Sequence, residues 1–182
     1  NYEKSLAAER LAEAGGAVQQ PFPGAVLGNP EGSVTLVEFT DYGCGFCRMS
    51  RDHVDALIAA NPDLRVVIRE WPIFEGSDDA ARMALAAAQQ DKFAAFHQAM
   101  FAQGSTSTTG IRAAAKTAGL DLAKADAFLS SQAIDMELEK NTALAQQLGF
   151  GGTPSWVVGD QAFEGAIGVD GLQEAIDAAR DL

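Results

Sequence analysis

Apolar residues follow strand-like and helix-like spacings along the chain, and the order of these spacings predicts its elements. Three runs rich in apolar and β-branched residues predict strands at residues 24–28, 34–39 and 64–71. Between the second and third runs, apolar residues recur at helical spacing until Asn61-Pro62 ends the pattern. The first part of the chain is therefore expected to form two strands, a helix and a third strand.

Helical spacing dominates from Ser77 to Leu148. Ser77 is expected to cap an alanine-rich helical stretch, whose Met and Phe residues are expected to lie in the core. A Ser/Thr-rich loop at residues 104–110 follows it. Three further helical patterns come after the loop, at residues 111–118, 122–129 and 134–148.

Strand spacing returns near the C-terminus. Residues 155–158 and 161–164 flank Gly159-Asp160, a pair typical of a hairpin turn. Residues 169–179 then predict a closing helix. Just before the hairpin, Thr153-Pro154 has two interpretations, because a proline here either begins an edge strand or follows a cis peptide bond.

The first residues of the chain predict an amphipathic helix. A loose apolar stripe runs among Glu and Arg residues, and glycines and prolines end it. The stripe consists of Tyr2, Leu6, Leu11, Ala14 and Val18. This segment is expected to dock on the domain, to extend as an arm, or to pair with another copy of the chain.

The only two cysteines, Cys44 and Cys47, lie where the second strand gives way to the helix. Unpaired N–H groups and the helix dipole favour a thiolate at a helix N-terminus, so the pKa of Cys44 is expected to be low. Cys47 lies within one helical turn, near enough to close a small disulfide ring. This arrangement predicts a redox-active pair.

Two other interpretations of the cysteine pair are weaker. A zinc site would need His53 and His97, but a predicted strand and helical residues separate the two histidines. A purely structural disulfide would stabilise little, because so short a loop removes little chain entropy from the unfolded state. His97 is instead expected to be a core residue, since it lies within the apolar helical packing.

Composition narrows the class of protein. The chain has 182 residues, and 47% of them are hydrophobic, which is enough for a core without disulfide staples. A formal net charge of −12 argues against binding of nucleic acid or anionic membrane surfaces. No run approaches the ~18 apolar residues of a membrane span. No secretory segment opens the chain, so any signal peptide is expected to have been removed.

The combination of motifs resembles the DsbA-like thiol:disulfide oxidoreductases of the thioredoxin superfamily, over about residues 25–182. The stretches that carry this resemblance are Val37 to Tyr42 before Cys44-Gly45-Phe46-Cys47, then Arg69-Glu70-Trp71-Pro72, then Gly151-Gly152-Thr153-Pro154. The stretch around Arg69 is most similar to the ScsC-like branch, some of whose members are oligomeric through an N-terminal segment.

The resemblance implies an α/β, thioredoxin-like fold with an inserted helical subdomain. The thioredoxin-like domain would comprise residues 25–76 and 150–182. Residues 77–149 would form the helical insertion, and residues 1–24 would form an N-terminal helical arm.

The resemblance also implies roles for particular residues. Cys44 is the nucleophile, Cys47 resolves the mixed disulfide, and Thr153-Pro154 is the cis-proline loop that receives the substrate chain. Gly45-Phe46, between the cysteines, is a further substrate-binding element, although it lacks the histidine of the strongest oxidants. Glu38, six residues before Cys44, matches the family's buried acid, which can exchange a proton with Cys47. Strand alternation alone also permits an outward-facing Glu38.

The implied activity is thiol:disulfide oxidoreduction of protein cysteines, in the periplasm or another extracytoplasmic compartment, without metal or organic cofactor. The implied partners are cysteine-containing client proteins and a membrane redox partner. Self-association through residues 1–20 would give a homo-oligomer. The alternatives are a disulfide isomerase or reductase and, from another class, a protein that binds copper(I) through its two thiolates.

Overall fold

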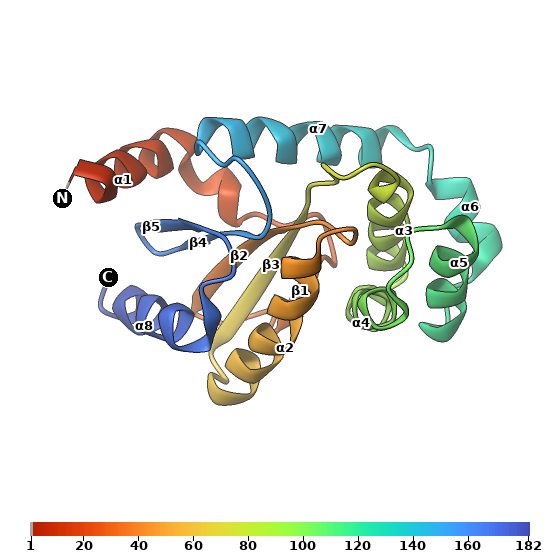
Figure 1. The fold of residues 1–182 in the computed structure, drawn as a ribbon, viewed down its shortest axis with the longest axis horizontal. Helices are drawn as coiled ribbons and strands as arrows, with labels where there is room; N and C mark the ends of the chain where they lie inside the picture. Colours follow the sequence, from red (N-terminus) through yellow and green to blue (C-terminus); the bar gives the residue numbers. More distant parts are fainter. Residues whose placement is uncertain (1) are drawn as a thin grey trace.

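The computed structural model describes residues 2–182 and places a five-stranded mixed sheet at the centre of the chain (Figure 1). Its spatial order is β1-β3-β2-β4-β5. The strands are β1 (Val26–Gly28), β2 (Val34–Thr40), β3 (Leu64–Glu70), β4 (Ser155–Val158) and β5 (Gln161–Glu164). All five predicted strands are confirmed.

Strand β2 is the centre of the sheet. It pairs parallel with β3 and antiparallel with β4, while β1 and β5 are the outer strands. A parallel pair needs a crossover connection, and helix α2 (Gly45–Ala60) supplies it between β2 and β3. The start of α2 therefore lies at the end of the central strand, as the sequence predicted.

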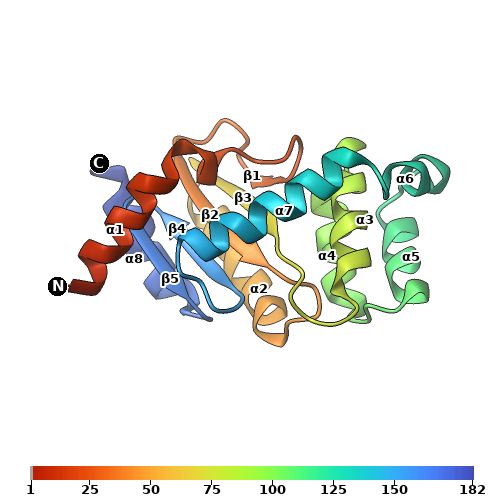
Figure 2. The same ribbon diagram turned by 90° about the horizontal axis from the view of Figure 1, so that it is seen from above.

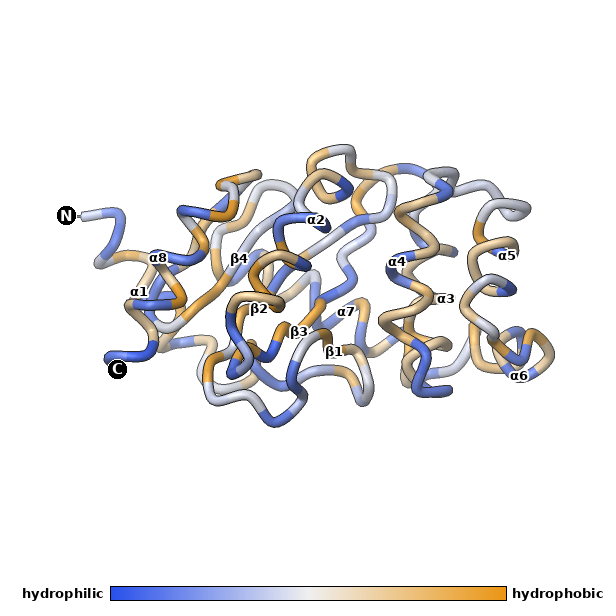
Figure 3. Tube along the Cα trace, turned by 90° about the horizontal axis from the view of Figure 1, so that it is seen from below, coloured by the Kyte–Doolittle hydropathy of each residue, from blue (hydrophilic) through white to orange (hydrophobic). Residues whose placement is uncertain are grey.

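The two faces of the sheet pack against different helices. On β2, Val34 and Leu36 join the core cluster that contains Val54 and Leu57 of α2. Val37 instead joins the cluster that includes residues of helix α7 (Gln132–Gln147). Helix α8 (Gly168–Arg180) also covers the α2 face (Figure 1). Figure 3 shows the hydrophobic residues of the strands, with hydrophilic residues interleaved on the surrounding helices.

The helical stretch after β3 forms a separate layer at one end of the molecule, apart from α7, which crosses the sheet (Figure 2). The helices before α7 are α3 (Ser77–Gln89), α4 (Phe93–Gln103), α5 (Thr108–Thr117) and α6 (Leu122–Phe128). The helical character of the stretch is confirmed. The division of the chain at residues 24, 76 and 149 stays a prediction.

One local prediction about this layer is wrong. Ser77 does not cap α3; Gly76 does, with a left-handed φ of 86°. Because Gly76 turns the chain there, Ser77 falls inside the first turn, and its buried Oγ has no hydrogen-bond partner among the described residues. The alanine-rich stretch also divides into α3 and α4, at a turn where Asp91 has a φ of 57°.

The N-terminal segment docks on the sheet. Helix α1 (Tyr2–Ala14) continues into a 3-10 helix, η1 (Gly15–Gln19), whose Val18 is buried against the β2 and β3 residues of the α7 face. Leu11 and Ala14 pack at the edge of the same cluster, whereas Tyr2 is 80% exposed. The structure thus favours docking over a free arm. Residue 1 of the predicted arm lies outside the described residues.

Arg69 on β3 is completely buried and joins three segments of the chain. Its Nη1 donates to Glu137 Oε2 at 3.2 Å and to Asn141 Oδ1 at 3.0 Å, both on α7. Its Nε and Nη2 donate to backbone oxygens of the N-terminal segment, those of Ala17, Val18 and Gln20. One guanidinium therefore ties η1 and α7 to β3.

Among residues 2–182, no helix combines the length and apolar character that crossing a membrane requires.

Candidate active site

Cys44 is the N-cap residue of α2. Its backbone is extended, with φ −94° and ψ 120°, so its side chain turns back over the first turn of the helix. The Cys47 N–H donates to the Cys44 sulfur at 3.3 Å. The predicted position of Cys44 at a helix N-terminus is thus confirmed, and its sulfur takes up one of the free N–H groups there.

The two cysteines are reduced and buried. Cys44 is 3% exposed and Cys47 is 1% exposed, and neither forms a disulfide in this structure. The Cys44 sulfur lies 3.4 Å from the backbone oxygen of Thr153, to which it donates when it is protonated, across a sequence separation of 109 residues. The fold thus brings the Thr153-Pro154 loop to the cysteine pair.

The Thr153–Pro154 peptide bond is cis. Strand β4 begins at the next residue and is paired on both sides, with β2 and with β5. Pro154 therefore does not begin an edge strand, and that interpretation is wrong.

The two thiols have opposite pKa shifts. The pKa of Cys44 is lowered to about 6, chiefly because the Cys47 side chain hydrogen-bonds to its sulfur. The N–H groups of Cys47 and Phe46 also lower it, while burial opposes them. Burial raises the pKa of Cys47, and its hydrogen bond to Cys44 and the charge of Glu38 raise it further. At neutral pH, Cys44 is therefore the thiolate and Cys47 remains a thiol.

Glu38 is a buried carboxyl group within electrostatic reach of both cysteines. It is 2% exposed, so the outward-facing interpretation is wrong. Strand alternation places it between Leu36 and Thr40 on the face that packs against α2. Burial raises the pKa of Glu38 to about 8, with a smaller contribution from the negative charge of Cys44. A carboxyl group with this pKa can both donate and accept a proton near neutral pH.

Large apolar side chains are exposed around the site. Phe46 between the cysteines is 62% exposed, and Met49 on the same helix is 48% exposed. In the loop after β3, Ile73 and Phe74 are 45% and 48% exposed. We refer to these four residues as the apolar rim.

Asp41 holds the loop that carries half of this rim. Its Oδ2 accepts the N–H groups of Ile73 at 2.7 Å and Phe74 at 2.8 Å, and its Oδ1 accepts the Gly43 N–H. Gly43 leaves room for this approach, because a Cβ there would lie 2.5 Å from the Ser77 Oγ and 3.2 Å from the Phe74 Cβ. Sequence reasoning did not single out Asp41. An Asp two residues before a glycine is the one local signal of such a turn.

His97 is a buried residue of the helical packing, as predicted. Its ring stacks on Phe93, and its Nδ1 lies 2.9 Å from the Tyr42 hydroxyl. Within residues 2–182, no three His, Cys, Asp or Glu side chains gather as a metal site would require.

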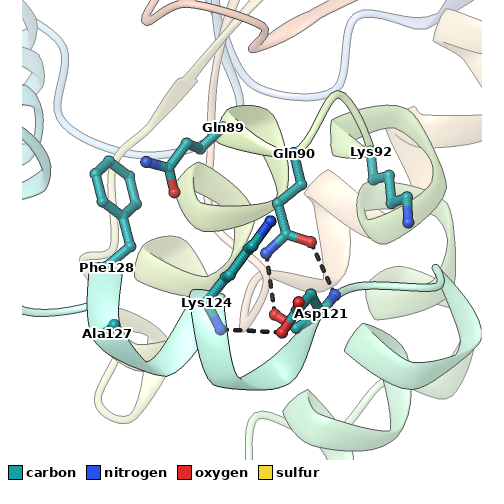
Figure 4. A pocket seen from close by; sticks show the side chains of 7 residues that line it. All are labelled: Gln89, Gln90, Lys92, Asp121, Lys124, Ala127 and Phe128. Atoms are coloured by element: carbon teal, nitrogen blue, oxygen red, sulfur yellow. Dashed lines mark hydrogen bonds between the residues drawn. The ribbon is translucent and has the colours of Figure 1, made fainter.

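A hollow of about 660 Å³ lies between the end of α3 and α6 (Figure 4). Its polar groups are largely engaged with each other: Gln90 exchanges two hydrogen bonds with the backbone of Asp121, and Lys92 donates to the backbone oxygen of Gly119. None of the cysteine-site residues lines it. It contributes nothing to the chemistry of the thiols.

Comparison with known families agrees with the geometry. Residues 35–177 match the model of the DsbA-like thioredoxin domain, which is most of the chain. The chain belongs to the DsbA-like thioredoxin-domain family. The predicted thioredoxin-like fold with a helical insertion is thereby confirmed.

Several solved structures resemble this DsbA-like chain. A thioredoxin-like oxidoreductase from Silicibacter pomeroyi is 45% identical, with a TM-score of 0.83 over 86% of this chain and 92% of that one. The thiol-disulfide exchange protein alpha-DsbA2 from Wolbachia pipientis is 26% identical, with a TM-score of 0.87 over 98% of both chains. A linker-deletion mutant of Proteus mirabilis ScsC is 25% identical, with a TM-score of 0.86 over 98% of this chain and 84% of that one. The expected similarity to the ScsC-like branch is confirmed.

The curated relatives are much longer proteins. The Na(+)/H(+) antiporter NhaA of Herminiimonas arsenicoxydans is 29% identical over 157 residues, which are 85% of this chain and 25% of that protein. The DsbA-like chain therefore spans about a quarter of the length of the curated relatives it matches.

Proposed function

We propose that the chain is a protein thiol:disulfide oxidoreductase that exchanges disulfides with client proteins through a mixed disulfide on Cys44. The observation that carries this proposal is the Cys44 sulfur at the start of α2, with its lowered pKa, beside the Thr153-Pro154 loop. The thiolate is the nucleophile in thiol–disulfide exchange, and a low pKa also makes it a good leaving group.

In the oxidising direction, a client thiolate attacks the Cys44 sulfur of the Cys44–Cys47 disulfide. The Cys44–Cys47 bond breaks, and Cys47 leaves with the electron pair and takes a proton. A second client thiolate then attacks the client sulfur of the mixed disulfide and releases Cys44 as a thiolate. Two electrons pass from the client to the enzyme, and the client gains a disulfide.

Glu38 is the proposed partner of Cys47 in proton transfer. The pKa of Cys47 is raised, so its thiolate needs a proton as it leaves, and Glu38, within electrostatic reach of it, has a pKa of about 8. The reverse transfer would activate Cys47 when it resolves a mixed disulfide.

The proposed client-binding surface consists of Thr153-Pro154, Gly45-Phe46 and the rest of the apolar rim. The exposed rim offers a client chain apolar contacts beside the reacting sulfur, and Thr153 brings backbone polar groups to the same point. We also propose an extracytoplasmic location, cysteine-containing clients and a membrane redox partner, in line with the family resemblance.

The lowered pKa of Cys44 favours the oxidase direction over isomerase or reductase activity, because a stabilised thiolate stabilises the reduced protein. Copper(I) binding by the two thiols is the alternative from another class. Catalytic turnover of reduced protein clients, with no added metal and with a copper(I) chelator present, supports the oxidoreductase. Tight copper(I) binding without turnover would support the alternative.

Substitution of Phe46 by serine is expected to lower kcat/KM for a protein client by roughly tenfold, since a buried phenyl group contributes about 1.5–3 kcal/mol. The rate with a small dithiol is expected to stay near that of the wild type, because a small dithiol does not cover the rim. Met136→Ser is the matched control, since Met136 is 60% exposed on α7 and outside the rim. If Phe46→Ser and Met136→Ser lowered kcat/KM for the protein client equally, the apolar rim would not be part of the client-binding surface.

The reduced protein is expected to be more stable than the oxidised protein at neutral pH, by a margin that falls as the pH is lowered. The pKa of Cys44 is about 6 in the folded protein, below the ~8.5 of a free cysteine. The stabilisation by Cys44 therefore grows as the pH rises from about 6 towards ~8.5 and is lost as the pH falls through about 6. The raised pKa of Cys47 has the opposite sign and acts only above pH ~8.5, so the comparison is made between pH ~5 and ~8.5. Glu38 is present in both forms, so most of its own effect cancels in the comparison.

Thermal unfolding of both forms across this range measures the margin. If the difference in stability between the reduced and the oxidised protein did not change with pH, the assignment of Cys44 as a thiolate at neutral pH would be contradicted.

A further inference from the structure

A column of polar side chains continues from Glu38 away from the cysteines. Glu38 and Thr40 share the α2 face of β2, and Thr40 stands opposite Glu70 in the parallel register with β3, so all three lie on one face. Thr40 is fully buried and Glu70 is 1% exposed. Buried polar side chains in such a row are uncommon without a function or a complete set of partners.

The column ends in a hydrogen-bonded chain. The Tyr42 hydroxyl lies 2.9 Å from Glu70 Oε1 on one side and 2.9 Å from His97 Nδ1 on the other. A hydroxyl has one hydrogen to donate, so one neighbour must itself donate to the Tyr42 oxygen. Either a protonated Glu70 or the His97 Nδ1–H meets this need. These two arrangements differ by the movement of protons along the chain.

Two buried atoms mark the link between Glu70 and β2. Thr40 Oγ1 and Glu70 Oε2 both lack a hydrogen-bond partner among the described residues, although their residues are register partners on the same face. Unpaired buried oxygens on neighbouring residues of one sheet face are positions where a bridging water is expected.

The charges around the column keep it neutral. Glu70 lies within electrostatic reach of Asp41, Glu38 and Glu137, and burial together with these carboxylates raises its pKa, against the hydrogen bond from Tyr42. Burial lowers the pKa of His97 to about 3, and Arg51 of α2 lowers it further. Glu38 lies within electrostatic reach of Cys44 and Cys47, as described above. A protonated Glu70 and a neutral His97 can pass a proton on without holding a charge.

We infer that Thr40, Glu70, Tyr42 and His97 form a rear proton route by which Glu38 exchanges protons while a client covers the cysteines. This inference rests on the proposed function. Each exchange cycle adds one proton to Cys47 and later removes it, yet Glu38 is buried and a bound client closes the front of the site. The route leads to His97, which lies within electrostatic reach of Arg51, whose side chain is 21% exposed.

The proton balance of the route is simple. One proton enters at His97, the His97 proton moves to the Tyr42 oxygen, and the Tyr42 proton moves to Glu70. Glu70 then passes a proton to Glu38 by way of the Thr40 hydroxyl and the bridging water expected beside it, and Glu38 has given its own proton to Cys47. Every group ends with the number of protons it began with, and Cys47 has gained one. Thr40, Glu70, Tyr42 and His97 are thus positioning residues that act through Glu38.

The test is the rate at which a reduced protein client reduces the oxidised full chain, measured from pH 5 to pH 9. Tyr42→Phe and Glu70→Gln are each expected to slow this reaction roughly tenfold at neutral pH. This loss is smaller than the roughly hundredfold or more that a general acid or base itself contributes, because both residues act through Glu38. In the Glu38→Gln background, neither substitution is expected to slow it further. The alkylation rate of Cys44, which needs no proton from Glu38, is expected to stay unchanged.

Glu75→Gln is the matched control, because Glu75 is an exposed carboxylate in the loop beside the site. Wild-type rates for Tyr42→Phe and Glu70→Gln would overturn the inference. The inference would also be overturned if Tyr42→Phe or Glu70→Gln slowed the exchange further in the Glu38→Gln background. It would be overturned as well if either substitution changed the alkylation rate of Cys44 as much as it changed the exchange rate. His97→Asn replaces Tyr42→Phe if thermal unfolding shows that the latter does not fold. Lack of exchange by the wild type would instead reject the proposed function.

Discussion

Replacement of Cys44 by serine is expected to reduce thiol–disulfide exchange by about a thousandfold or more, because it removes the nucleophile. The Cys47→Ser variant is expected to behave differently. It retains the Cys44 sulfur that makes the first attack, but it lacks the thiol that resolves the mixed disulfide. It should therefore accumulate covalent complexes with client proteins, which non-reducing electrophoresis detects and dithiothreitol dissolves.

The contrast between the two variants is the informative result. Both remove one buried thiol from the same helix turn, so a general loss of structure would affect them alike. Covalent client complexes in Cys44→Ser and none in Cys47→Ser would reverse the assigned roles.

Replacement of Arg69 by methionine is expected to lower the free energy of unfolding by about 3–5 kcal/mol, the usual cost of breaking a buried ion pair. The side chain is fully buried, and its loss leaves the Glu137 carboxylate buried with the partly exposed Lys140 as its remaining cationic partner among residues 2–182. The backbone oxygens of Ala17, Val18 and Gln20 also lose their donor. Urea unfolding with an unchanged m-value measures the difference.

Arg82→Met is the control for this prediction. Arg82 also donates to two carboxylates and a backbone oxygen, but its side chain is 24% exposed, so its loss is expected to cost about 1 kcal/mol or less. An Arg69→Met variant as stable as Arg82→Met would show that the buried guanidinium does not hold η1 and α7 on the sheet.

The elements of the fold could be predicted because each has a local pattern. The run at residues 34–39 and the helical spacing up to Asn61 depend only on neighbouring residues, and both became the expected elements. The position of Cys44 at a helix N-terminus followed from the same local boundary. Ser77 shows the limit, because Gly76 and Ser77 are both acceptable cap residues and only the observed left-handed turn distinguishes them.

The rest of the site depends on contacts between distant parts of the chain. Tyr42 meets Glu70 and His97 across separations of 28 and 55 residues, and no periodicity signals such a meeting. Arg69 was singled out only as part of a family motif, and its role in joining η1 to α7 is visible only in three dimensions. The sequence placed Glu38 on the strand that became β2, but only the packed structure showed which face of the sheet its side chain points to.

The dipeptide between the cysteines illustrates a different limit. Gly45-Phe46 lacks the histidine of the strongest oxidants, which suggested a less stabilised Cys44 thiolate. The largest cause of the low pKa of Cys44 is instead the Cys47 side chain, which hydrogen-bonds to the Cys44 sulfur. Cys47→Ala is therefore expected to raise the pKa of Cys44, whereas Cys47→Ser retains a donor.

The pH dependence of alkylation of the reduced wild-type protein tests the central claim most directly, namely that Cys44 is an activated thiolate. The wild type is required because the Cys47 thiol is the main cause of the low pKa. Alkylation confined to Cys44, with a midpoint at about 6, is the predicted result. A midpoint near the ~8.5 of a free cysteine, or preferential alkylation of Cys47, would contradict it.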